Sequence, residues 1–144
     1  MGTFEVFDHT ADIGLKVRGT NLADLLETAT RATFGQMLRD LPADVEVIGE
    51  VRAATAGGIE DDPGELLVLW LQELLYRFET ERLVPLTFTF GVVGPREACA
   101  DVGFGRFDPR RHQARLEIKA VTYHGLDVHA EAGGAWSARF ILDV

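Results

Sequence analysis

Alternating apolar and polar positions predict two strands near the start of the chain. Ile13, Leu15 and Val17 alternate with small or charged residues, which is the period of two of a half-buried strand. Segments 3–7 and 13–18 are therefore expected to be strands. The connection between them is expected to carry two aspartates and a histidine.

Two stretches have the apolar spacing of helices. The first is expected to begin at Asn21, a residue type that favours the N-cap position, and to run to about residue 39. The second is expected to begin at Asp62, because a proline follows at the first helical position and Glu65 lies where a capping box needs it. This second helix is apolar nearly all round, so we expect it in the core.

The other apolar segments read as strands separated by turns that contain glycine or proline. They are expected at residues 45–55, 84–93, 98–106, 113–123, 126–131 and 135–142. Helices among the first strands, followed by a run of antiparallel strands, predict the α+β class. We expect one domain over residues 1–144, with two helices packed on a largely antiparallel β-sheet in two layers.

Composition limits the range of partners. The chain has 144 residues, 47% of them hydrophobic, with a single cysteine and no apolar run long enough for a membrane span. With no visible signal peptide, these features predict a cytoplasmic protein. The net charge of −9 would repel a polyanion, so tight direct binding of nucleic acid is not expected. A basic partner or a cation suits such a protein better.

Carboxylates at the two ends of the chain are candidates for a metal site. Asp8 and Asp12 flank His9, and Asp143 is expected to face outward beside Val144 and its terminal carboxylate. If the first and last strands pair, these oxygens converge, and hard cations such as Ca²⁺ or Mg²⁺ prefer oxygen ligands. Each aspartate alone could equally cap a turn or lie at a solvated chain end. Only the presence of several such carboxylates in one place favours a metal site.

A histidine and a lysine are further candidates. His9 could be a ligand or a base, or it could fix the turn through a hydrogen bond to a backbone carbonyl, the role we favour. Lys119 is one of only two lysines beside twelve arginines, and it falls in the expected strand 113–123. It could contact a phosphate, pair with a carboxylate, or be an ordinary solvated residue. A nucleophile elbow, a P-loop and a dinucleotide fingerprint are all missing from the sequence, which argues against ordinary hydrolase or transferase chemistry.

Four motifs in order carry a family resemblance. They are the Asp-His-Thr-Ala-Asp block, Asn21-Leu22-Ala23-Asp24-Leu25-Leu26, Lys119-Ala120-Val121-Thr122-Tyr123-His124, and Ile141-Leu142-Asp143-Val144. Together they resemble archease, a family of accessory proteins of RNA ligases. The resemblance implies a small α+β protein whose partner is an RtcB-type RNA ligase of tRNA splicing or RNA repair. Such a protein is not an enzyme: it promotes metal- and GTP-dependent guanylylation of the ligase and its multiple turnover.

The resemblance also implies roles for particular residues. Asp12 and Asp143 would bind a divalent metal, with Ca²⁺ expected and Mg²⁺ or Mn²⁺ as alternatives. Asp8 and the terminal carboxylate of Val144 are additional candidate ligands. Lys119 and His9 would contact the ligase and take part in its activation. A stand-alone metal-dependent phosphohydrolase and a chaperone-like binding module are the alternative functions.

Overall fold

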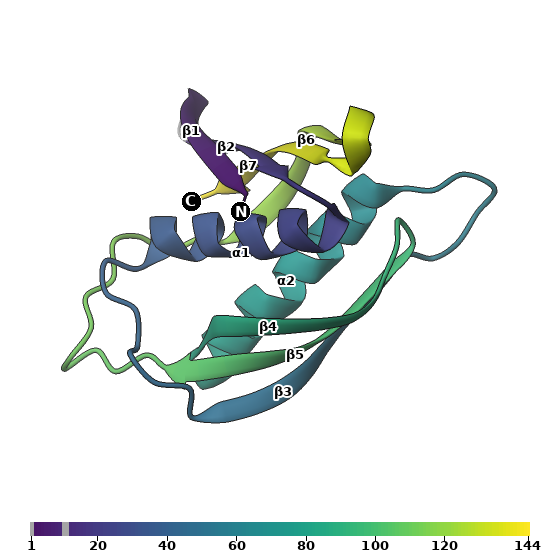
Figure 1. Ribbon diagram of the computed structural model, residues 1–144. Helices are drawn as coiled ribbons and strands as arrows, with labels where there is room; N and C mark the ends of the chain where they lie inside the picture. The colour runs from purple at the N-terminus through teal and green to yellow at the C-terminus, as the bar shows by residue number, and fades with distance from the viewer. Residues whose placement is uncertain (1, 10–11) are drawn as a thin grey trace.

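The protein is described by a computed structural model that covers residues 2–9 and 12–144, apart from the side chain of His9 (Figure 1). In chain order the elements are β1 (Thr3–His9), β2 (Asp12–Gly19), α1 (Leu22–Met37), β3 (Val47–Ala54), α2 (Pro63–Glu81), β4 (Leu83–Val93), β5 (Glu97–Arg106), β6 (Ala120–Ala130), the short 3-10 helix η1 (Ala132–Gly134) and β7 (Trp136–Asp143). The predicted α+β class is confirmed. Neither α1 nor α2, the α-helices of the described residues, has the length and hydropathy that crossing a membrane requires.

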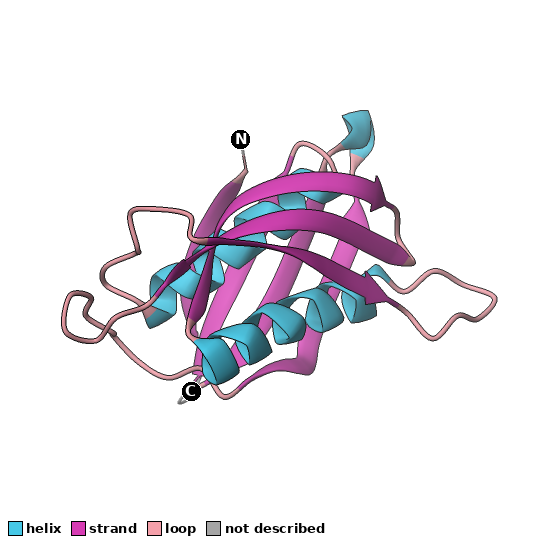
Figure 2. Cartoon of the chain, turned by 90° about the horizontal axis from the view of Figure 1, so that it is seen from below, coloured by secondary structure: helices cyan, strands magenta, loops and turns pink. Residues whose placement is uncertain are grey.

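The described strands form two antiparallel sheets. One has the order β1-β2-β7-β6 and the other β3-β5-β4. Both helices contact both sheets and lie between them (Figure 1). The strands of the two sheets run in different directions (Figure 2). The expectation of a single sheet in two layers was therefore wrong, because a second sheet covers the far side of the helices.

The apolar character of α2 explains why a second sheet covers the helices. Trp70, Leu71 and Leu74 are fully buried in this helix. The helix packs against β6 of the first sheet and against β3 and β4 of the second. With only one sheet, one side of α2 would stay in water, at a cost of about 25 cal/mol for each Å² of apolar surface.

Both helices begin where their caps predict. The Asn21 side chain accepts a hydrogen bond from the Asp24 backbone N–H at 2.8 Å, and Asp62 accepts one from the Glu65 N–H at 3.0 Å. Each cap satisfies a backbone donor that has no partner inside its helix. These starts were predictable because the cap and its partner lie within one helical turn.

The predicted break between strands 113–123 and 126–131 was wrong. A single strand, β6, crosses that position, and its register on β7 shifts between Thr122 and Asp127. Gly125 lies in this irregularity with a φ of +65°, a left-handed conformation that glycine adopts without strain. The glycine therefore lies in an irregular stretch inside one strand and does not separate two strands.

Residues 107–119, which connect β5 to β6, form no named strand. Their backbone bonds instead to the residues at the end of α1. The Arg115 N–H donates to the Met37 carbonyl at 2.7 Å, and the Arg39 N–H donates to the Gln113 carbonyl at 2.8 Å. Lys119 consequently lies at the end of an irregular segment, which corrects its expected position inside a strand.

Candidate functional site

Strands β2 and β7 bring two predicted residues together at one end of the four-stranded sheet. Ile13 pairs with Leu142, and the same register carried one residue further sets Asp12 opposite Asp143. Leu142 is fully buried on the helix side, so its neighbour Asp143 faces the other side of the sheet. Residues opposite each other in antiparallel strands share a face, with Cβ atoms about 5 Å apart. Asp12 and Asp143, both half-buried, thus form a carboxylate pair on the outer face.

Lys119 is anchored beside this pair through its backbone. Its N–H donates a hydrogen bond to the Asp143 carbonyl at 2.8 Å, and the next residue, Ala120, pairs with Asp143 in the sheet. The Lys119 side chain is exposed. Three residues that are far apart in the sequence are therefore held at one end of one sheet: two carboxylates on the outer face, and Lys119 with its backbone bonded beside them.

The structure divides the remaining candidates. His9 pairs with Asp12 in the sheet, so its backbone lies beside Asp12. Its side chain is not among the described parts of the structure. Asp8 pairs with Ile13 and therefore alternates to the opposite face from Asp12. The sequence analysis placed Asp8 and His9 in the connection between the first two strands. The structure corrects this, because both residues belong to β1. The predicted Thr10-Ala11 part of the motif lies outside the described residues.

The donor atoms of this site suit a hard cation but do not surround one. Among the described residues, no group of three or more histidine, cysteine, aspartate or glutamate side chains could hold a metal ion. Asp12 and Asp143 supply carboxylate oxygens, the ligands that Ca²⁺ and Mg²⁺ prefer, whereas these ions take about six or more ligands. The half-buried Val144 follows Asp143 directly and packs against the core. A cation bound by the pair would keep open positions for ligands from elsewhere.

Lys119 also lines a cavity of about 450 Å³ between α2, the end of α1 and residues 107–119. Phe78 and Phe107 contribute rings to its wall, and Arg82 lies at its edge. This cavity was not predicted from the sequence. No local pattern could have revealed it, because its residues come from segments that meet only in the folded chain.

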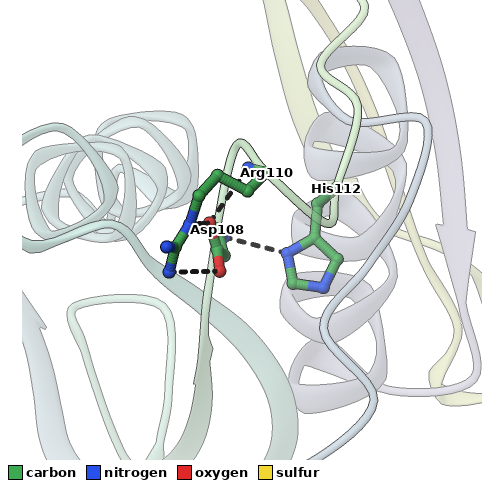
Figure 3. Close-up of polar contacts among 3 residues, drawn as sticks. All are labelled: Asp108, Arg110 and His112. Carbon is green, nitrogen blue, oxygen red and sulfur yellow. Dashed lines mark hydrogen bonds and ion pairs between the residues drawn. The ribbon is translucent and has the colours of Figure 1, made fainter.

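A tight turn supports Phe107 at this wall. The His112 Nδ1 accepts a hydrogen bond from the Asp108 backbone N–H at 2.9 Å, and the His112 and Phe107 rings lie 5.6 Å apart. Figure 3 shows Asp108 between Arg110 and His112. Hydrogen bonds from the Arg110 backbone N–H, and then from its side chain, hold the pKa of Asp108 below its ordinary value.

Comparison with known proteins shows the family of this chain. Residues 4–144 match the family described as the Archease protein family. The chain belongs to the archease family. Among its relatives, the protein archease of Methanopyrus kandleri is 35% identical, over 98% of this chain and 99% of that protein. The protein archease of Sulfolobus acidocaldarius is 30% identical over the full length of both chains.

A solved structure has the same fold as this chain. The solution structure of protein 1598 of Methanobacterium thermoautotrophicum is similar, with a TM-score of 0.72 and 31% identity. The match covers 98% of each chain. The family resemblance predicted from four short motifs is thus confirmed over nearly the whole chain. Archease family membership supports an accessory role for this chain in RNA ligation during tRNA processing.

Proposed function

We propose that this archease is an activator of an RtcB-type RNA ligase. It would promote metal- and GTP-dependent guanylylation of the ligase, and so allow the ligase to turn over repeatedly. The observation that carries the proposal is the meeting of Asp12, Asp143 and Lys119 at one end of the four-stranded sheet. These are the residues to which the family resemblance assigns metal binding and activation.

The proposed site works by presenting charge and not by forming a covalent bond. Asp12 and Asp143 would hold a divalent cation, expected to be Ca²⁺, with Mg²⁺ or Mn²⁺ as alternatives. When bound, the cation supplies positive charge that phosphate oxygens can share. Lys119, anchored by its backbone, can direct its compact ammonium group at a phosphate or at a carboxylate of the partner.

The charge of the chain supports an action through a protein partner. At a net charge of −9, most of the surface repels RNA phosphates. An activator that contacts the ligase needs no RNA-binding surface of its own. Long-range attraction would favour a basic surface on the ligase and would weaken as salt is added.

The two alternative functions have less support. A two-metal phosphohydrolase gathers carboxylates around both ions, and the described residues supply a pair. A chaperone-like module needs exposed apolar surface, for which the two tryptophans were the candidates. Trp70 is fully buried and Trp136 is half-buried, so neither offers such a surface.

Ligation turnover tests the proposal. The ligase from the same source would be mixed with RNA ends bearing a 2′,3′-cyclic phosphate and a 5′-hydroxyl, with GTP and a divalent metal. We expect many joined ends per ligase when this protein is present in catalytic amounts, and far fewer without it. Equal product in both reactions, under every metal tested, would overturn the proposal.

A further inference from the structure

The cavity beside Lys119 has the properties of a ligand site. Its volume of about 450 Å³ falls within the range of roughly 300–1,000 Å³ that is common for small-molecule pockets. The floor is apolar and includes the buried side chains of Met37, Leu38 and Ile118. Charged side chains from α2 and from residues 107–119 surround this floor. An apolar base with a charged rim suits a compact ligand that has an apolar body and polar ends.

Aromatic rings favour a flat ligand. The Phe78 and Phe107 rings meet edge to face, with their centroids 5.8 Å apart. The Arg82 guanidinium lies 5.4 Å from the centroid of Phe78. Aromatic faces and guanidinium planes stack on the bases of nucleic acids and nucleotides. A planar heterocycle therefore matches this wall better than a branched aliphatic group.

The cations of the rim favour an anionic group on that ligand. Arg82, Arg115 and Lys119 all line the cavity, and within the described part of the chain none of them forms an ion pair. Several other arginines do, among them Arg31 and Arg77. These three cations outnumber the two carboxylates that line the same cavity, Glu79 and Glu117, so the lining carries a net positive charge in a chain whose net charge is −9. A phosphate offers acceptor oxygens for all three.

The rim also contains acceptors for N–H groups. Glu79 and Glu117 line the same cavity, and neither forms an ion pair within the described residues. Carboxylates repel a phosphate, so they would serve a different part of the ligand. An ionised carboxylate only accepts hydrogen bonds, and guanine presents two adjacent N–H donors at one edge. Stacking rings, phosphate-binding cations and base-binding carboxylates are thus all present.

The backbone at Arg82 has a conformation that is unusual for a residue with a side chain. Arg82 is the C-cap of α2, with φ of 60° and ψ of 31°, and it is the one non-glycine residue of positive φ in the described chain. This conformation costs a residue other than glycine roughly 1–2 kcal/mol. Glycine is the usual residue at such a helix end. Strained residues cluster at binding sites, which agrees with the place of Arg82 in the lining of this cavity.

We infer that this cavity binds a guanine nucleotide directly. Arg82, Arg115 and Lys119 would contact its phosphate, and the rings of Phe78 and Phe107 would pack against the base. Glu79 and Glu117 would accept the N–H groups of the base. The site goes beyond the proposed activator function and shares with it only Lys119.

Calorimetric titration of the isolated protein with GMP tests the inference. EDTA is included, so that the Asp12–Asp143 pair contributes no metal. We expect saturable GMP binding, with guanosine and inorganic phosphate each about tenfold weaker or worse, since each lacks one half of the contacts. AMP should also bind more weakly, because adenine lacks the adjacent pair of donors. Equal binding of inorganic phosphate, equal binding of AMP, or no saturable GMP binding would each overturn the inference.

Two variants locate the site. Arg82→Gly removes the guanidinium and suits the left-handed backbone, so this variant is expected to fold; it should bind GMP about tenfold more weakly. Arg52→Gln is the matched control, since Arg52 is an exposed, ion-paired residue on β3 of the other sheet and should leave GMP binding unchanged. Equal GMP affinity in the two variants would also overturn the inference. Because no ligase is present, the result is independent of the proposed activation.

Discussion

At the residue scale, the central feature is the pairing of Asp12 with Asp143. Alternation within the segment 13–18 predicted that Asp12 faces away from the core, and alternation near the end of the chain predicted the same for Asp143. The pairing itself needed the structure, because sequence alone does not state that β2 is the neighbour of β7. The strand order also places β1 at the edge of the sheet. Asp8 pairs with Ile13 of β2 and therefore lies on the opposite face from Asp12.

Asp12 and Asp143 should control metal affinity. Asp12→Asn and Asp143→Asn each remove one charged oxygen ligand, so each should weaken Ca²⁺ binding about tenfold or more in calorimetric titrations. Asp101→Asn is the matched control, since Asp101 is an exposed aspartate on β5 of the other sheet. Unchanged Ca²⁺ affinity in both site variants would contradict the predicted metal site.

Two buried threonines of α1 should respond in opposite ways to the same substitution. The Thr30 hydroxyl accepts a hydrogen bond from the Trp70 indole N–H at 2.9 Å, whereas the buried Thr33 hydroxyl has no hydrogen-bond partner among the described residues. Thr30→Val should therefore lower the free energy of unfolding by about 1–3 kcal/mol, and Thr33→Val should leave it unchanged or raise it. Urea unfolding of both variants gives the comparison. Equal losses would show that the hydroxyl of Thr30 has no special role.

Asp108 should titrate at a lower pH than an ordinary aspartate. Its pKa is lowered from 3.8, first by the hydrogen bond from the Arg110 backbone N–H and then by the Arg110 side chain (Figure 3). Because the folded-state pKa is depressed, its contribution to stability is complete above pH 3.8 and is lost as the pH falls through the folded-state pKa.

An NMR titration of the Asp108 carboxyl group measures this pKa. Arg110→Gln should raise the midpoint only part of the way, because the backbone hydrogen bond remains. A wild-type midpoint at or above the ordinary value would contradict the assignment.

At the element scale, features set by residues close in the sequence were predicted correctly, and features set by the pairing of distant segments were not. The starts of both helices were predicted from their caps, since a cap and its partner lie three residues apart. Residues 113–119 were misread as part of a strand, because the backbone partners of this irregular stretch lie near Met37, about half the chain away. The second sheet was missed because sheet membership depends on which strands meet, and alternation within one strand does not encode that.

Two glycines should show opposite effects when replaced by alanine. At Gly125, φ is +65° and an added Cβ would meet the Arg139 side chain, so Gly125→Ala should cost about 1–2 kcal/mol. At Gly35, inside α1, an added Cβ meets nothing within 4 Å, so Gly35→Ala should stabilise the protein by about 0.5–1 kcal/mol. Thermal or urea unfolding separates the two. A stabilising Gly125→Ala would argue against the left-handed conformation of residue 125.

At the scale of the whole molecule, the two sheets have different roles in this account. The four-stranded sheet carries Asp12 and Asp143 on the face turned away from the helices, and Lys119 lies where its strand β6 begins. The three-stranded sheet completes the burial of α1 and α2. The net charge of −9 would disfavour RNA, and the proposed function assigns recognition to a protein partner. The proposed metal site thus occupies one end of one sheet, and the helices and the second sheet support it.

The initial rate of ligase guanylylation tests the central claim most directly. Wild-type protein in catalytic amounts, with GTP and a divalent metal, should accelerate label transfer to the ligase from the same source. Lys119→Gln, Asp12→Asn and Asp143→Asn should each abolish most of the acceleration while keeping the wild-type circular dichroism spectrum. Lys16→Gln, which changes the other lysine of the chain, should keep it. Full acceleration by all three site variants, or none by the wild type, would contradict the account.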